Sequence, residues 1–94
     1  MIEKLQALTH EYSLLEQSLG DPALIGDQTR YRTAMQRYSE LQTVVRAFET
    51  YQEIRRGLEN AREALSDPDL AEMARDEVAE AQRAARAWLA KAAA

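Results

Sequence analysis

The sequence predicts an all-α protein, an elongated antiparallel three-helix bundle or coiled coil built around a long central helix. Ala, Leu, Glu, Arg and Gln dominate the composition, and all five have high helix propensity. Apolar residues recur at spacings of three and four along most of the chain, which is the period of a helix with one buried face. The prolines, Pro22 and Pro68, divide the chain into helix-length stretches.

Both prolines lie in segments of the form Leu-x-Asp-Pro-x-Leu, at residues 19–24 and 65–70. The residue before a proline disfavours the helical conformation, whereas proline itself suits the first turn of a new helix. An aspartate just before the proline can accept hydrogen bonds from free backbone N–H groups. Each segment therefore predicts a corner between two helices.

The first helix is expected at about residues 2–19 and ends at Gly20, and a short helical turn is expected at 22–25. Asp27 then provides a candidate N-cap for the next helix. The apolar positions that predict the buried face of the first helix are Ile2, Leu5, Leu8, Tyr12, Leu15 and Leu19.

The second helix is expected at about residues 28–65, a length of roughly 57 Å at 1.5 Å per residue. Its apolar positions change face near its middle, which predicts a change of packing partner there. The first helix can line only the first half of the second, and the third helix only the second half. The first set of positions is Tyr31, Ala34, Tyr38, Leu41, Val45 and Phe48, and the second is Tyr51, Ile54, Leu58, Ala61 and Leu65.

The third helix is expected from Pro68 to about residue 91, and the whole chain, residues 1–94, is predicted to be a single helical domain. Acidic residues near the start of this helix and basic residues near its end match the helix dipole. The best-packed layer is expected to hold Val45, Phe48 and Trp88 with Ile2 or Leu5. The apolar positions of the third helix are Leu70, Met73, Ala74, Val78, Ala81, Ala85, Trp88 and Leu89.

The composition excludes several kinds of site. The chain has no cysteine and a single histidine, His10, so the usual metal-ligand spacings cannot be assembled and His10 is expected at the surface. The glycines occur singly, which leaves no phosphate-binding loop. We therefore predict no catalytic, cofactor-binding or metal-binding residue, no small-molecule substrate, no membrane span, and a chain that is not an enzyme.

The net charge of −4 argues against a dedicated nucleic-acid-binding protein. Only residues 28–65 are net positive, with seven bases and five acids. These arginines either form salt bridges along the helix, with Glu40, Glu49, Glu53 and Glu59 as partners, or form a weak phosphate-facing strip. The arginines concerned are Arg30, Arg32, Arg37, Arg46, Arg55, Arg56 and Arg62.

The four tyrosines fall on the apolar faces of the helices, where a ring can be buried while its hydroxyl stays in water. They are therefore predicted to belong to the core rather than to a surface that stacks on nucleic-acid bases. These residues are Tyr12, Tyr31, Tyr38 and Tyr51.

Residues 65–77 resemble the opening of the third helix in bacterial peptide chain release factor 1, a Leu-x-Asp-Pro-[Glu/Asp]-x-x-Glu-Met-Ala-x-x-Glu pattern. A Lys-Leu-x-x-Leu start at residues 4–8, the turn at 19–22 and an Arg-Tyr pair at 30–31 followed by Tyr38 agree with this factor in order and spacing. The matching positions of the pattern are Leu65, Asp67, Pro68, Asp69, Glu72, Met73, Ala74 and Glu77.

This resemblance implies the N-terminal helical domain of a cytoplasmic translation termination factor, acting as a docking arm on the ribosome. It implies two partners, the stalk base of the large ribosomal subunit and the GTPase that recycles release factors, with weak or no direct nucleic-acid binding by this domain. The family hydrolyses peptidyl-tRNA with a Gly-Gly-Gln tripeptide and reads stop codons with a Pro-x-Thr tripeptide, and this sequence contains neither.

Two other functions remain open at this point. An RNA-binding helical arm, like that of seryl-tRNA synthetase, would need a cationic face. A stand-alone coiled-coil interaction module would need a long uninterrupted heptad, which the change of face at residues 48–51 disfavours.

Overall fold

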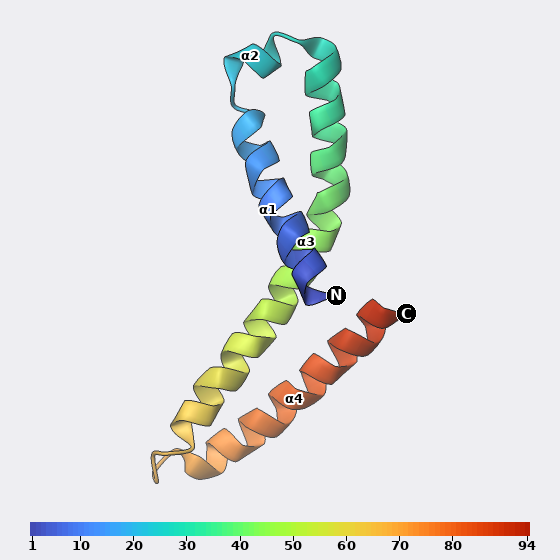
Figure 1. Ribbon diagram of the computed structural model, residues 1–94. Coiled ribbons are helices and arrows are strands. Elements are labelled where there is room, and N and C mark those ends of the chain that lie inside the picture. Colours follow the sequence, from blue (N-terminus) through green and yellow to red (C-terminus); the bar gives the residue numbers. More distant parts are fainter. The chain divides into compact units, whose positions relative to one another are not determined.

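A computed structural model describes all of residues 1–94, which form four helices and no strand (Figure 1). The all-α prediction is confirmed. None of the helices combines the length and the apolar composition that a membrane span requires. The helices are α1 (Ile2–Ser18), α2 (Pro22–Ile25), α3 (Gln28–Ala64) and α4 (Ala71–Ala93).

The chain forms two compact units, Met1–Phe48 and Glu49–Ala94, and α3 contributes residues to both. The division falls where the sequence predicts that the apolar face of α3 rotates. Beyond it, Gln52 and Arg55, which a continued heptad would bury, are exposed, whereas Leu58 is buried. The change of face is confirmed, while the single-domain organisation stays a prediction.

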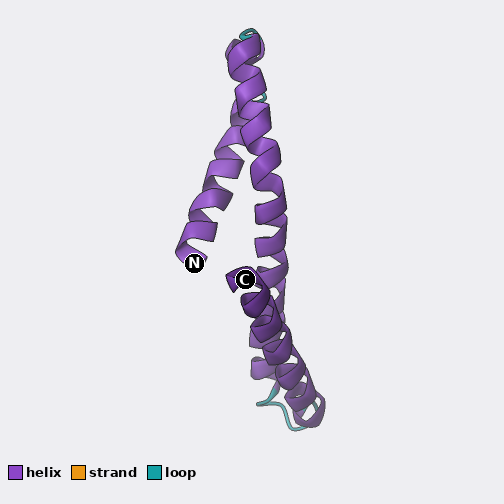
Figure 2. Cartoon of the chain, turned by 90° about the vertical axis from the view of Figure 1, so that its right-hand side faces the viewer, coloured by secondary structure: helices purple, strands orange, loops and turns teal.

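In the first unit, α1 runs antiparallel to the first part of α3, and α2 lies at the connection between them (Figure 1). The core of this unit holds Leu41, Val45 and Phe48 of α3, each 3% exposed. All six apolar positions predicted for α1 are half-buried, but none is fully buried. Figure 2 shows α1 and α3 separating toward the N-terminus of the chain.

Two aspartates shape the connection between α1 and α3. The Asp21 carboxylate accepts a hydrogen bond from the backbone N–H of Ala23 at 3.0 Å, at the start of α2. The Asp27 carboxylate accepts one from the N–H of Arg30 at 3.2 Å, and its carbonyl accepts one from the N–H of Tyr31 at 2.8 Å. The predicted capping role of Asp27 is therefore observed.

The second corner is built differently, and α4 begins at Ala71 rather than at Pro68. The Asp67 carboxylate accepts a hydrogen bond from the N–H of Asp69 at 2.9 Å, and the Asp67 carbonyl accepts one from Leu70 at 3.0 Å. The carboxylate bond spans two residues, as it does at Asp21, but the Asp67 carbonyl accepts from residue 70 and not from residue 71, so it closes a turn rather than the first turn of an α-helix. The α-helical hydrogen bonds begin where the N–H of Ala74 donates to the carbonyl of Leu70, four residues earlier, at 2.8 Å.

The late start of α4 changes the environment of its first apolar positions. Leu70 is 45% exposed and Met73 is 62% exposed, so the prediction that both belong to the buried face is wrong. Leu65, expected on the buried face of α3, is also exposed. The corner therefore presents apolar side chains to solvent.

In the second unit, α4 packs antiparallel to the last part of α3 (Figure 1). Small residues make up most of this core, since Ala61, Ala74 and Ala85 are buried together with Leu58. Trp88 lies against Tyr51, with ring centroids 4.7 Å apart and planes tilted by 34°. The predicted contact between Trp88 and Phe48 joins residues of different units and stays a prediction.

Candidate functional site

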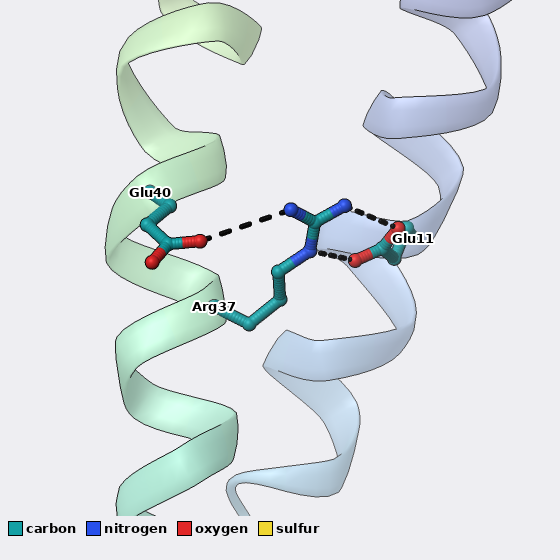
Figure 3. Close-up of polar contacts among 3 residues, drawn as sticks. All are labelled: Glu11, Arg37 and Glu40. Carbon is teal, nitrogen blue, oxygen red and sulfur yellow. Dashed lines mark hydrogen bonds and ion pairs between the residues drawn. The ribbon is translucent and has the colours of Figure 1, made fainter.

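The first polar cluster of the protein is centred on Arg37 of α3 (Figure 3). Its Nε donates a hydrogen bond to Glu11 Oε2 of α1, and its Nη2 donates one to Glu11 Oε1 at 3.0 Å. Glu40, one turn further along α3, places Oε2 at 3.8 Å from Arg37 Nη1. The guanidinium thus joins α1 to α3 through a two-point contact with a carboxylate.

This geometry favours the charged forms of both partners. The hydrogen bond from Arg37 lowers the pKa of Glu11, an effect that partial desolvation opposes and the positive charge of Arg37 reinforces. The same hydrogen bond raises the pKa of Arg37. A carboxylate held ionised in this way is a poor proton donor near neutral pH, so the cluster acts as a clamp between helices.

A second cluster lies beside the first. The rings of Tyr12 and Tyr38 stack with centroids 4.3 Å apart, and the Tyr38 hydroxyl donates a hydrogen bond to Glu16 Oε1 at 3.4 Å. The hydrogen bond with Tyr12, desolvation and the charge of Glu16 together raise the pKa of Tyr38 to about 12. Both rings are half-buried between α1 and α3, as the sequence predicts for core tyrosines.

The remaining arginines of α3 show that only part of the salt-bridge interpretation is correct. Of the four glutamates predicted as partners, Glu40 lies within ion-pair distance of Arg37, whereas Glu49, Glu53 and Glu59 form no ion pair within 4.0 Å. Arg46 is exposed on the same helix. Five other arginines of α3 are exposed and without an ion pair, namely Arg30, Arg32, Arg55, Arg56 and Arg62.

The structure contains no group of three or more His, Cys, Asp or Glu side chains placed to hold a metal ion. His10 is exposed on α1, where the sequence places it. A shallow depression of about 320 Å³ in the first unit is lined by Ile25, Gln28, Tyr31, Arg32 and Met35, which include no carboxylate or imidazole that could serve as a general base at neutral pH.

The corner between α3 and α4 combines exposed apolar side chains with negative charge. Residues 63–77 contain six acids and one base, Arg75, and no acid among them forms an ion pair. This surface disfavours phosphate and suits contact with a protein. The exposed apolar residues are Leu65, Leu70 and Met73.

The comparison with protein families matches the PCRF domain to residues 8–93, nearly the whole chain. The chain belongs to the PCRF domain family. This family forms the helical N-terminal region of peptide chain release factors, so the protein has a role in translation termination of the release-factor type. No solved structure matches the chain significantly.

Sequence reasoning missed the acidic partners on α1. Glu11 and Glu16 follow no recognisable motif, and they contact residues 26 and 22 positions further along the chain. An antiparallel register that pairs Tyr12 with Tyr38 would have placed Glu11 near Arg37, because both lie one residue before a tyrosine. The aromatic pair was the signal that could have found this contact.

Proposed function

We propose that this PCRF domain is a non-catalytic docking arm of a translation termination factor. It acts in the cytoplasm on the ribosome, contacts the stalk base of the large subunit, and communicates there with the GTPase that recycles release factors. Binding to RNA by this domain alone is weak or absent in this proposal.

The observation that carries the proposal is the PCRF match over residues 8–93 of a chain that lacks the tripeptides of the family's chemistry. No two glycines are adjacent, so Gly-Gly-Gln is absent. Pro22 is followed by Ala23-Leu24 and Pro68 by Asp69-Leu70, so neither begins a Pro-x-Thr tripeptide. What this chain can contribute to termination is therefore binding rather than hydrolysis or codon reading.

The surface chemistry supports two kinds of contact. Exposed arginines of α3 without an ion pair, such as Arg30 and Arg55, can each form a two-point contact with a phosphate of ribosomal RNA. The acidic corner with Leu70 and Met73 suits a protein surface instead. A stalk base that contains both RNA and protein can engage both surfaces.

The test is co-sedimentation of the 94-residue chain with ribosomes, comparing intact large subunits with subunits depleted of the stalk-base proteins. We expect saturable binding to intact subunits, a loss of binding after depletion, and no release of peptide from a termination complex. Equal binding to depleted subunits would move the docking site elsewhere, and peptide release by the chain alone would refute the non-catalytic role.

A further inference from the structure

The second unit carries a groove between α3 and α4 that the packing of the chain leaves open. Its volume is about 330 Å³, and it faces solvent. Small and apolar residues form most of its lining, and the rest consists of two carboxylates on α4. The lining residues are Ile54, Gly57, Glu77, Glu80, Ala81 and Ala84.

Gly57 is the unusual residue of this groove. It lies in the interior of the 37-residue helix α3, where glycine is less favourable than alanine. Its φ is not positive, and a Cβ added to it would meet no atom within 4 Å. Neither backbone conformation nor packing inside this chain therefore requires glycine, which is otherwise typical of places where another backbone or ligand approaches closely.

The charge of the groove lining favours some classes of binding partner over others. Residues 76–80 contain three acids and no base, and neither Glu77 nor Glu80 forms an ion pair in the structure. These two carboxylates lie three residues apart on α4, so they stand on one side of the helix. Their negative potential disfavours nucleic acid and a second copy of the same acidic groove, and it favours a cationic partner.

The shape of the groove suits an α-helix. Two antiparallel helices leave a channel between them in which a third helix can lie, with its apolar stripe on the small residues of the floor. Gly57, Ala81 and Ala84 offer little side-chain bulk, so a partner backbone can approach closely. A Lys or Arg flanking the apolar stripe would reach Glu77 and Glu80.

We propose that this groove is a docking site for an amphipathic helix of another protein, one whose apolar stripe is flanked by basic side chains. The proposal goes beyond the ribosome-docking role, because it identifies a separate surface and the chemistry of its occupant. It does not depend on where the arm sits on the ribosome.

A synthetic helical peptide provides the probe. It has about 20 residues, enough for measurable helicity, with Leu and Ala in an i, i+3, i+4, i+7 stripe and Lys on both flanks. A second peptide replaces each Lys by Glu. Binding is measured by fluorescence anisotropy, and the groove is located by amide chemical-shift changes in the labelled 94-residue chain.

The decisive variant is Gly57→Leu, which fills the groove while replacing a poor helix former by a good one. Its thermal midpoint is expected to equal or exceed that of the wild type, so any loss of binding is not a folding defect. We expect affinity for the basic peptide to fall by about ten-fold or more, because a bulky side chain occupies the approach path. Ala7→Leu, at an exposed position of α1, is the matched control and leaves binding unchanged.

The charge requirement has its own variant, Glu77→Lys combined with Glu80→Lys. This double variant is expected to bind the basic peptide about ten-fold more weakly than the wild type does, and to bind the acidic peptide more tightly. Glu59→Lys is the control, because residue 59 lies about 200° around α3 from Gly57.

Three outcomes would overturn the proposal. The first is that the basic peptide does not bind the wild type. The second is that it binds Gly57→Leu as tightly as it binds the wild type. The third is a wild-type dimer in sedimentation that Gly57→Leu abolishes, which would assign the groove to a second copy of the chain. None of these outcomes affects ribosome co-sedimentation, so the groove and the docking role fail separately.

Discussion

Arg37 illustrates how single residues connect the helices of the first unit. Its guanidinium contacts Glu11 of α1 at two points and lies 3.8 Å from Glu40 of its own helix. Both Arg37 and Glu11 remain partly exposed, with side chains 45% and 41% accessible, so solvent weakens the attraction. The contact is compatible with one register of α1 on α3, because the fork of the guanidinium fits one carboxylate position.

The Glu11 contact predicts a dependence of stability on pH. The pKa of Glu11 is lowered in the folded chain, so its contribution to stability is present above its ordinary pKa of 4.5 and is lost as pH falls through the folded value. We expect the thermal midpoint of Glu11→Gln to lie below that of the wild type at neutral pH. The difference should disappear in acid, as measured by circular dichroism melts.

The control for this experiment is Glu53→Gln, an exposed position in the interior of α3 without an ion pair. It should melt like the wild type across the acid range. A Glu11→Gln midpoint that equalled the wild type at neutral pH would show that the Arg37 contact contributes nothing to folding.

Tyr38 predicts a second dependence, at alkaline pH. The pKa of Tyr38 is raised to about 12 in the folded chain. Its contribution to the stability of the fold is therefore fully present below the ordinary tyrosine pKa of 10 and is lost as pH rises toward 12. Tyr38→Phe keeps the ring stacked on Tyr12 but removes the hydroxyl. We expect the wild type to lose stability between pH 10 and 12 and Tyr38→Phe to lose less.

Absorbance of tyrosinate provides the measurement, since the late ionisation expected of Tyr38 should vanish in Tyr38→Phe. The Tyr31→Phe variant serves as comparison, because no stacking partner is found for Tyr31. Simultaneous ionisation of all four tyrosines in the folded chain would contradict the prediction.

At the scale of elements, periodicity predicted the helices well because each helix is amphipathic. The observed α1 and α3 end one residue before the predicted ends, at Ser18 and Ala64, and the change of face in α3 coincides with the boundary between Phe48 and Glu49. In a long helix the buried positions repeat many times, so an error at one position has little effect on the assignment.

The residue at which α4 begins could not be predicted from the periodicity of apolar residues. Leu-Ser-Asp-Pro-Asp-Leu at 65–70 predicts a capped helix start, but the Asp67 carbonyl accepts a hydrogen bond from Leu70, three residues on, and closes a turn before α4 begins. An aspartate before proline supports both conformations, and the choice between them depends on how α4 must turn to pack on α3. The groove between α3 and α4 could not be predicted from the sequence either, because a single glycine such as Gly57 forms no recognisable motif.

The core of the second unit predicts a contrast between two leucines. Leu58 is 2% exposed, and its replacement by Ala should lower the free energy of unfolding by about 2 to 4 kcal/mol, through reduced burial and the cavity left behind. Leu14 on α1 is 49% exposed, so its replacement by Ala should lower the free energy of unfolding by less than about 0.5 kcal/mol. Urea denaturation followed by circular dichroism measures both values, and a similar cost at the two positions would contradict the structure.

At the scale of the whole molecule, charge is distributed unevenly along the sequence. Residues 28–48 of α3 carry four bases and one acid, whereas the corner between α3 and α4 is strongly acidic. The positive stretch remains the strongest sequence argument for contact with phosphate, and the acidic corner the strongest for contact with protein. The balance between them decides whether the domain binds RNA by itself.

The net charge of −4 and the isoelectric point near 5.0 predict that it does not. Affinity for RNA comes mainly from cations that displace counterions, so acidic residues that repel phosphates lower both the affinity and its dependence on salt. In filter binding with ribosomal RNA, we expect no saturable binding at physiological salt, and at low salt a shallow dependence that Arg30→Gln and Arg32→Gln reduce further. Tight binding that fell steeply with salt would instead support an RNA-binding arm, because only a continuous cationic face can release many counterions at once.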